Sequence, residues 1–345
     1  MNKIKKQILN YTLDELKTEL ENLGEKKFRA DQIFVWLHKK NAQSFDEMSN
    51  LSKVLREKLA EEFDISLLKV KTVAKSETDI ANKYLFELQD GQFLESVYMQ
   101  EEERVTLCVS TMVGCPIGCP YCATGLMGFK RNLTTAEIVN QLTYINAQEE
   151  KPITNIVYMG MGEPFLNYDN VIKSAQLFNH PSGAEISARK ITISTCGIVP
   201  GINKMAKEGH KFKLAVSLNG TTDEQRTIMI PINVKFSTKM LMQSLQKYTE
   251  YTGQRVTFEY ILVKDFNDRN EDAQRLKTML STFPCKLNVI PYNENTHCAF
   301  KAPDEKGLNK FIKKLYKAPF TVTVRRSKGQ DIAAACGQLY ADTKK

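Results

Sequence analysis

Hydrophobic residues in the first 65 positions recur every three or four residues, which is the period of amphipathic helices. Thr12 and Glu15 form a capping-box pattern that predicts the start of a first helix. A second helix is expected over residues 30–40, and the capping-box pattern repeats at residues 44–47 before another helical run. We therefore expect residues 1–65 to form a small helical accessory domain.

Alternating hydrophobic and polar positions replace the helical period over residues 66–104. The pair Asp90-Gly91 separates two such runs, Tyr84–Leu88 and Phe93–Tyr98, which is a strong short-range signal for a β-hairpin. This segment is expected to be a β-hairpin connector that packs against the main domain.

From residue 105 onward, short strand-like runs rich in Ile, Val and Leu alternate with helix-like segments. The alternation predicts parallel strands that are linked by crossover helices and buried on both faces. Thr134 and Glu137, for example, form a capping-box pattern ahead of a helix. We expect an α/β fold over residues 105–345, arranged as an open or closed barrel. The seven predicted strands are Thr106–Ser110, Asn155–Gly160, Lys190–Thr195, Lys213–Leu218, Val256–Leu262, Lys286–Pro291 and Thr321–Arg325.

The composition of the 345 residues is that of a globular protein with a mild basic bias. The chain has 48 Lys and Arg residues against 40 Asp and Glu residues, a formal net charge of +8. Such a bias is compatible with a polyanionic partner and does not require one. The basic residues between positions 306 and 328 fit RNA contact and a solvated helix face equally well. Nothing indicates an exposed apolar seam, so we expect a monomer.

A cytoplasmic location without membrane contact is expected. No apolar run approaches the length of a bilayer span, and the lysine-rich residues 1–10 are not followed by the apolar core of a secretion signal. The eight cysteines, all beyond residue 107, then argue for a reducing compartment and against a disulfide framework.

Three cysteines have the spacing of an iron–sulfur ligand loop. Cys115, Cys119 and Cys122 form a C-x3-C-x2-C pattern directly after an apolar run. Iron–sulfur clusters are ordinarily held by four cysteines. Three would leave one iron of a four-iron, four-sulfur cluster open to bind S-adenosylmethionine through its amino and carboxylate groups. A zinc site is the alternative, but structural zinc prefers four ligands in paired C-x2-C spacings, and no nearby His or Cys completes that set.

Several unusual residues fall at the carboxyl ends of predicted strands, where the functional residues of barrel-like α/β domains gather. Gly162 and Glu163 follow the second strand. Glycine permits a close backbone approach and the carboxylate could accept an ammonium group, although an ordinary strand-to-helix turn is the alternative. Ser194, Ser217 and Asn293 could hydrogen-bond a cofactor, although serines at strand ends also cap helices.

Two more cysteines and one glutamate lie in apolar surroundings. Cys336 follows three alanines and Cys108 lies in an apolar strand, where cysteine is more often a small buried hydrophobe than a nucleophile. Glu95 breaks another apolar strand. If buried, it could accept a proton, whereas an exposed strand face is the simpler interpretation. The residues alone leave these alternatives open.

These motifs, in this order, are similar to those of one family, the radical S-adenosylmethionine RNA methyltransferases of the RlmN/Cfr type. The resemblance covers nearly the whole chain. The matching segments are F-R-A-D-Q-I-F, C-V-S-T-M-V-G-C-P-I-G-C-P-Y-C-A-T-G, G-F-K-R-N-L-T, M-G-M-G-E-P, I-S-T-C-G-I, P-I-N, V-T-F-E-Y, N-V-I-P-Y-N and D-I-A-A-A-C-G-Q-L.

The resemblance implies a partial (β/α) radical S-adenosylmethionine barrel and a role for each site residue. Cys336 would carry a methyl group as S-methylcysteine, Cys108 would be its partner thiol, and Glu95 would be the proton acceptor. One [4Fe-4S] cluster would be held by Cys115, Cys119 and Cys122. S-Adenosylmethionine would be held by Gly162, Glu163, Ser194, Ser217, Leu218, Asn219 and Asn293.

The family's reaction uses two S-adenosylmethionine molecules per turnover. One methylates Cys336, and the other is cleaved reductively at the cluster to a deoxyadenosyl radical, which takes a hydrogen atom from the S-methyl group. The carbon radical adds to adenine, a base removes the ring proton, and Cys108 attacks the sulfur of Cys336, so that methylated RNA leaves as a disulfide forms. The disulfide must then be reduced, and the adenine must be exposed in a loop or flipped out.

The implied substrates are adenine 2503 of 23S ribosomal RNA, in the peptidyl transferase centre, and adenine 37 of transfer RNAs, both methylated at carbon 2. An electron donor such as flavodoxin or ferredoxin is also implied. The family branch that methylates carbon 8 shares all these motifs and is the nearest alternative. A non-catalytic, metal-containing RNA-binding protein is the alternative from another class.

Four positions depart from the residues that are usual in the family. Asn219 stands in place of His, Cys196 in place of Ser, Ala333 in place of Asp, and Met112 in place of Gln. None of these removes a cluster ligand or either redox cysteine. They affect the details of cofactor contact rather than the reaction class.

Overall fold

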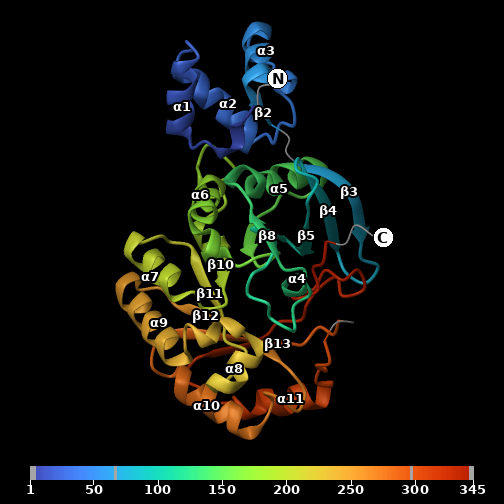
Figure 1. Ribbon diagram of the computed structural model, residues 1–345, viewed down its shortest axis with the longest axis vertical. Coiled ribbons are helices and arrows are strands. Elements are labelled where there is room, and N and C mark those ends of the chain that lie inside the picture. The colour runs from blue at the N-terminus through green and yellow to red at the C-terminus, as the bar shows by residue number, and fades with distance from the viewer. Residues whose placement is uncertain (1–4, 66–67, 296–297, 342–345) are drawn as a thin grey trace.

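The computed structural model describes residues 5–65, 68–295 and 298–341 (Figure 1). A small helical domain lies at one end of the molecule, and a large α/β domain makes up the remainder. The predicted boundary between the first domain and the connector falls at residues 66–67, which lie outside the described residues. The domain boundaries therefore stay predictions.

The N-terminal domain is helical, as its hydrophobic period predicts. Thr12 and Glu15 bond reciprocally through side chain and backbone, which confirms the first capping box. The second capping box, at residues 44–47, is also present, but it begins a three-residue 3-10 helix, and the next α-helix starts later behind Ser52. The elements are β1 (Lys6–Gln7), α1 (Leu13–Asn22), α2 (Phe28–His38), α3 (Lys53–Glu62) and β2 (Phe63–Asp64), which pairs with β1.

The predicted hairpin is present, but it is not a separate connector. It is formed by β4 (Ala81–Leu88) and β5 (Phe93–Glu101), and β3 (Leu68–Lys75) pairs with the outer side of β4. On its inner side, β5 pairs antiparallel with β6 (Arg104–Cys108), the first strand of the α/β core. The segment therefore extends the main sheet. Alternation along one strand identifies its two faces but not the neighbour that its edge will pair with.

Seven parallel strands form the core of the sheet. Their order is β14-β13-β12-β11-β10-β9-β6, followed by the antiparallel β5-β4-β3. Because β14 and β6 are not paired with each other in the described residues, the parallel strands form a partial barrel, as expected for this fold class (Figure 1). The strands are β9 (Asn155–Tyr158), β10 (Ile191–Thr195), β11 (Lys213–Ser217), β12 (Val256–Leu262), β13 (Cys285–Pro291) and β14 (Thr321–Val324).

Helices cover the outer side of these strands. The capping box predicted at Thr134 and Glu137 is confirmed at the start of α5. In the described part of the chain, no helix is both long enough and apolar enough to cross a membrane. The helices are α5 (Thr135–Gln148), α6 (Tyr168–Asn179), α7 (Val199–Glu208), α8 (Asp223–Met229), α9 (Thr238–Thr252), α10 (Asn270–Leu280) and α11 (Glu305–Lys314).

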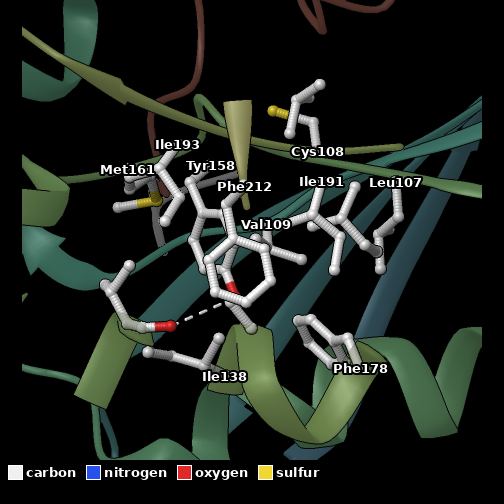
Figure 2. Packing of buried hydrophobic residues seen from close by; sticks show 14 of the residues in the cluster. Leu107, Cys108, Val109, Ile138, Tyr158, Met161, Phe178, Ile191, Ile193 and Phe212 are labelled. Carbon is white, nitrogen blue, oxygen red and sulfur yellow. Dashed lines mark hydrogen bonds between the residues drawn. The ribbon is translucent and has the colours of Figure 1, made fainter. Parts of the chain in front are cut away.

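The hydrophobic core lies between the sheet and these helices. The side chains of the segment that contains β6 point to both faces of the sheet. Leu107 and Val109 point toward Ile138 of α5 and Phe178 of α6, whereas Cys108 points to the opposite side (Figure 2). Successive side chains of a strand alternate between its faces. The apolar run that anchors β6 in the core therefore also carries a thiol toward the concave side of the barrel.

His38, at the end of α2, gives the stability of the fold a predicted pH dependence. Its ring is buried beside Phe34 and His180, and within the described residues its Nε2 has no hydrogen-bond partner. Burial, together with His180, lowers the pKa of His38 to about 3, whereas an unfolded His titrates near pH 6.5. Because the pKa of His38 is lower in the folded state, the contribution of the neutral ring to the free energy of unfolding is complete above about pH 6.5. It is lost as the pH falls toward 3, by at most roughly 1.4 kcal/mol per pH unit.

Denaturant unfolding of the wild type and of His38→Gln, compared between about pH 7 and about pH 5, measures this effect. The wild type should lose more stability over that interval than the variant, because only the wild type must bury a group that protonates when unfolded. Parallel pH profiles would contradict the prediction.

Candidate active site

A clamped loop carries the three spaced cysteines. β7 (Met112–Gly114) and β8 (Phe129–Asn132) pair antiparallel at the two ends of the loop. The Cys115 N–H donates to the Gly128 carbonyl at 3.0 Å. A Cβ atom on Gly114, whose φ is +72°, would lie 1.8 Å from that carbonyl oxygen, so only glycine fits there. The backbone thus fixes the direction in which Cys115 leaves the strand.

Cys115, Cys119 and Cys122 lie within one another's electrostatic reach. Burial raises the pKa of the Cys115 thiol to about 12 and the pKa of the Cys119 thiol well above its usual range, and neighbouring thiols of the loop add to both shifts. A bound metal removes this cost, because a coordinating thiol is deprotonated outright. The donor set therefore fits an iron–sulfur cluster.

The zinc alternative finds less support. Across residues 5–65, 68–295 and 298–341, no three His, Cys, Asp or Glu side chains are gathered around one point, and this holds for Cys115, Cys119 and Cys122 as for every other set. A structural zinc site needs four such ligands around one centre. The three-cysteine loop alone therefore does not supply the four ligands of a structural zinc site.

The glycine turn after β9 places Glu163 next to the cluster loop. Gly162 has a φ of +106°, and a Cβ atom there would lie 2.7 Å from the Met112 side chain. The buried carboxylate of Glu163 accepts the N–H of Phe165 at 3.0 Å through Oε1 and that of Cys196 at 2.7 Å through Oε2. Burial raises the pKa of Glu163, and these two hydrogen bonds oppose the shift. Each oxygen keeps a lone pair that could accept an ammonium group.

The two remaining candidate thiols line one cavity of about 1150 Å³ on the concave side of the partial barrel. Cys108 comes from β6 and Cys336 from the C-terminal segment. Burial first, and then the charge of Cys336, raise the pKa of the Cys108 thiol to about 12, while the Arg325 guanidinium opposes the shift. The shared lining and this electrostatic coupling bring together two thiols that are far apart in the sequence.

Strand register places Glu95 on the same face of the sheet as Cys108. Val97 lies opposite Cys108, and Glu95 is two residues from Val97 along β5, so the three side chains share a face. Glu95 is only 4% exposed, so the exposed-face interpretation is wrong. Its Oε1 lies 3.0 Å from Lys83 Nζ, and its Oε2 accepts the Tyr340 N–H at 2.9 Å.

Residues 329–341, which we call the catalytic segment, are held on one side by the residues that follow β13. The Asn293 side chain donates to the Cys336 carbonyl at 3.1 Å and accepts from the Gln330 side chain at 2.9 Å. Asn293, an expected cofactor contact, thus also positions the backbone of Cys336.

On the other side, the catalytic segment is held by β3–β4 and by the cluster loop. The Asp331 carboxylate accepts from the Ser76 hydroxyl and the Glu77 N–H, both at 2.8 Å. The Gly337 carbonyl accepts the N–H of Ala123, the first residue of α4 (Ala123–Leu126), at 2.7 Å. Cys336 is therefore fixed against the loop that carries Cys122.

The other expected cofactor contacts lie in two different settings. Ser194 and Ser217 share the face of β10 and β11 that lines the cavity, because Ser217 lies opposite the cavity residue Glu259. Leu218 and Asn219 are fully buried. Their contacts with S-adenosylmethionine stay predictions.

Asn219 has a visible structural role. Its Nδ2 donates to the Tyr121 hydroxyl and its Oδ1 accepts the Ile261 N–H, both at 2.9 Å. The side chain thus braces the cluster loop against β12. The Asn219 amide supplies both a donor and an acceptor here. A neutral His could do so only in one tautomer, with one ring nitrogen as the donor and the other as the acceptor.

Sequence reasoning missed Arg226 and Lys83. Arg226 of α8 is fully buried and donates to the Cys196 carbonyl and to Asn233 Oδ1, so it ties the carboxyl end of β10 to α8. Lys83 pairs with Glu95. A single cation in an amphipathic pattern gives no signal of burial, although a buried Glu95 implies that a positive partner is near.

Two family models match the chain. The model of the ribosomal RNA large subunit methyltransferase N-terminal domain matches residues 6–65, and the model of the radical SAM superfamily matches residues 109–276.

Relatives and a solved structure match along nearly the full length. The dual-specificity RNA methyltransferase RlmN 2 of Myxococcus xanthus is 46% identical over 327 residues, which cover 92% of this chain and 86% of the relative. The dual-specificity RNA methyltransferase RlmN of Geotalea uraniireducens is 44% identical over 337 residues, which cover 97% of this chain and 96% of the relative. The crystal structure of a radical SAM methyltransferase from Sphaerobacter thermophilus has 38% identity and a TM-score of 0.95, covering 98% of this chain and 100% of that chain.

Proposed function

This chain belongs to the RlmN family of radical S-adenosylmethionine RNA methyltransferases, and on that premise we propose that it methylates carbon 2 of adenine in RNA. The observation that supports the proposal most directly is that Cys108 and Cys336 line one cavity beside the three-cysteine loop. Carbon 2 of adenine is electron-poor, so direct displacement from a sulfonium does not reach it. A route through a protein-bound carbon needs one thiol to carry the group and a second to release it.

The site residues fit one [4Fe-4S] cluster and S-adenosylmethionine. Cys115, Cys119 and Cys122 would hold the cluster, and the Glu163 carboxylate would accept the ammonium group of S-adenosylmethionine. Gly162 and the cavity-facing Ser194 and Ser217, with Leu218, Asn219 and Asn293, would complete the cofactor site. When bound, these groups supply a deoxyadenosyl radical.

Cys336, Cys108 and Glu95 have different roles in the proposed reaction. Cys336 attacks the methyl carbon of a first S-adenosylmethionine, so that S-adenosylhomocysteine leaves and Cys336 becomes S-methylcysteine. After a hydrogen atom is removed from this methyl group, its carbon bonds to carbon 2 of adenine and links Cys336 to RNA. The adduct is a radical, so restoring the aromatic ring removes one electron, which the cluster would accept, and one proton, which Glu95 accepts. Cys108 attacks the sulfur of Cys336, and the carbon–sulfur bond breaks with its electron pair on the methylene carbon, which takes up a proton to become the methyl group. A thiol reductant then reduces the resulting disulfide.

The proposed substrates are adenine 2503 of 23S ribosomal RNA and adenine 37 of transfer RNAs. The relatives' name, dual-specificity RNA methyltransferase, supports two RNA targets. We further propose a cytoplasmic monomer that receives electrons from flavodoxin or ferredoxin. The family assignment argues against the alternative of a non-catalytic RNA-binding protein.

Nucleoside mass spectrometry tests the proposal. Unmodified ribosomal RNA and transfer RNA are treated anaerobically with reconstituted protein, S-adenosylmethionine and a reductant. The expected product is 2-methyladenosine, identified against chromatographic standards. Formation of 8-methyladenosine would instead assign the chain to the carbon-8 branch. No methylated adenosine, with an intact cluster and an active reference enzyme alongside, would overturn both assignments.

Glu95→Gln should lower single-turnover methylation by about 100-fold to 10,000-fold, because general-base catalysis typically contributes that much. RNA affinity should not change, because Glu95 is buried under Tyr340. The matched control is Glu87→Gln on the neighbouring strand β4, where the carboxylate pairs with Lys71 away from the cavity. Equal methylation rates for both variants would show that Glu95 is not the proton acceptor.

A further inference from the structure

Cations gather at the end of the barrel cavity that is opposite the cofactor loops. Arg104, Lys190, Lys211, Lys213, Arg255 and Lys286 all line the cavity of about 1150 Å³. Each lies at or just before the amino-terminal end of its strand, in β6, β10, β11, β12 or β13. Because the strands are parallel, these ends form one rim, which we call the amino-terminal mouth.

Lys213 lies within the electrostatic field of three other cations of the mouth. Burial lowers the pKa of Lys213, and the charges of Lys286, Arg104 and Arg255 lower it further. Arg104 belongs to β6 and Lys286 to β13, so it is the curvature of the partial barrel that brings these charges together. Folding thus concentrates like charges, which is unfavourable unless an anion joins them.

Acidic residues do not neutralise the mouth. Within the described residues, no ion pair joins any of the six cations to a carboxylate. Two acids of the cavity rim are engaged elsewhere: Glu101 lies 3.6 Å from Lys328 and Glu103 lies 3.9 Å from Lys151. Glu259, farther inside, faces Lys286 and Arg325, but burial raises its pKa and its Oε1 accepts from Asn288. The mouth therefore keeps an excess of positive charge.

We propose that the amino-terminal mouth binds the phosphate backbone of the RNA substrate, at a place separate from the methylation site. Lys213, Arg255 and Lys286 belong to three adjacent strands, each about 4.8 Å from the next. Their charges are therefore spread over a distance greater than a single phosphate group spans. Arg104 and Cys108 are at opposite ends of β6, roughly 13 Å apart along the strand. RNA bound at the mouth therefore leaves the cavity at Cys108 free for the target base.

The proposal rests on RNA being the substrate, and its test is binding rather than catalysis. The mouth variant carries Arg104→Gln, Lys213→Gln, Arg255→Gln and Lys286→Gln. The matched control carries Lys207→Gln, Lys239→Gln, Lys247→Gln and Lys277→Gln, the same loss of charge on the outer helices α7, α9 and α10. Binding of an unmodified 23S ribosomal RNA fragment and of a transfer RNA is measured between about 50 and 200 mM salt.

Loss of each phosphate contact should reduce the slope of log affinity against log salt by about one, so the mouth variant should lose about three to four. Its affinity at about 100 mM salt should fall at least about tenfold, for both RNAs alike. The control variant should keep the wild-type slope. A mouth variant with the same salt slope and RNA affinity as the control variant would overturn the proposal. A mouth variant that loses affinity for a mononucleotide but keeps its affinity for RNA would overturn it as well.

Two further measurements keep the result interpretable. Arg255→Gln alone changes an exposed residue, and it should lower the slope by about one even if the fourfold variant does not fold. Product formation by the mouth variant at saturating RNA separates the two hypotheses. If the mouth variant methylates RNA and binds it as the wild type does, the mouth proposal alone is wrong. If the wild-type protein neither binds nor methylates RNA, the proposed function is wrong.

Discussion

Cys336→Ala should abolish methylation, lowering turnover at least about a thousandfold, because in the proposed route the sulfur of Cys336 is the atom that carries the methyl carbon. The rest of the catalytic segment should keep its position in this variant. The contacts of the segment with Asn293, Ala123 and Ser76 are made by backbone groups or by neighbouring side chains, not by the Cys336 thiol. Cluster content and RNA affinity should therefore match the wild type.

Single-turnover assays with labelled S-adenosylmethionine give the rate, and iron analysis and RNA binding give the two controls. Cys298→Ala is the matched variant, because it removes another partly buried thiol, which does not line the barrel cavity. It should methylate at close to the wild-type rate. Methylated RNA from Cys336→Ala would refute the route through S-methylcysteine.

Cys108→Ala should fail at a different point from Cys336→Ala. Without the resolving thiol, the bond between Cys336 and the base cannot be broken by disulfide formation, so a covalent protein–RNA species should accumulate. Denaturing gels of reactions with labelled RNA would reveal it. Free methylated RNA at the wild-type rate would show that another group releases the product.

Cys119→Ala should remove the cluster, and with it all radical chemistry. Cys119 is the most buried of the three loop cysteines as a whole residue, and without its sulfur only two of the three thiolates would remain for the cluster. After anaerobic reconstitution, iron and sulfide should fall from four of each per chain in the wild type to a small fraction. S-Adenosylmethionine cleavage to deoxyadenosine should fall below detection.

The control for this variant is Cys285→Ala in β13. That thiol is equally buried but donates to the Leu280 carbonyl at 3.3 Å, far from the loop in sequence. It should cost stability, as large-to-small core changes do, and leave iron content unchanged. A Cys119→Ala protein with full iron content would remove Cys119 from the ligand set.

Much of the architecture was predictable, because it rests on local signals. The seven parallel strands, the hairpin at Asp90-Gly91 and the capping boxes at Thr12 and Thr134 follow from periodicity and turn chemistry, which act over a few residues. The later start of α3 was not predicted, since the pattern at residues 44–47 was equally able to begin a short 3-10 helix.

The parts of the site that sequence did not predict depend on contacts between distant segments. Periodicity placed Glu95 in a strand but not its burial, which requires Lys83 and the backbone of Tyr340. Likewise, nothing near Asn219 in the sequence indicates that its amide joins Tyr121 to β12. The family resemblance supplied the expected roles of Cys108 and Cys336, and the structure adds the cavity that they share.

The contacts of the catalytic segment also set an order of events during synthesis. Asp331 closes onto Ser76 and Glu77, which leave the ribosome more than 250 residues earlier, and chains grow at about 5–20 residues per second. Cys122 therefore emerges roughly 10–40 s before Cys336. Gly337 and Leu339 then cover the cluster loop through Ala123 and Thr124. We expect this interval to be when iron and sulfide are most easily delivered, before residues 331–339 close the nascent site.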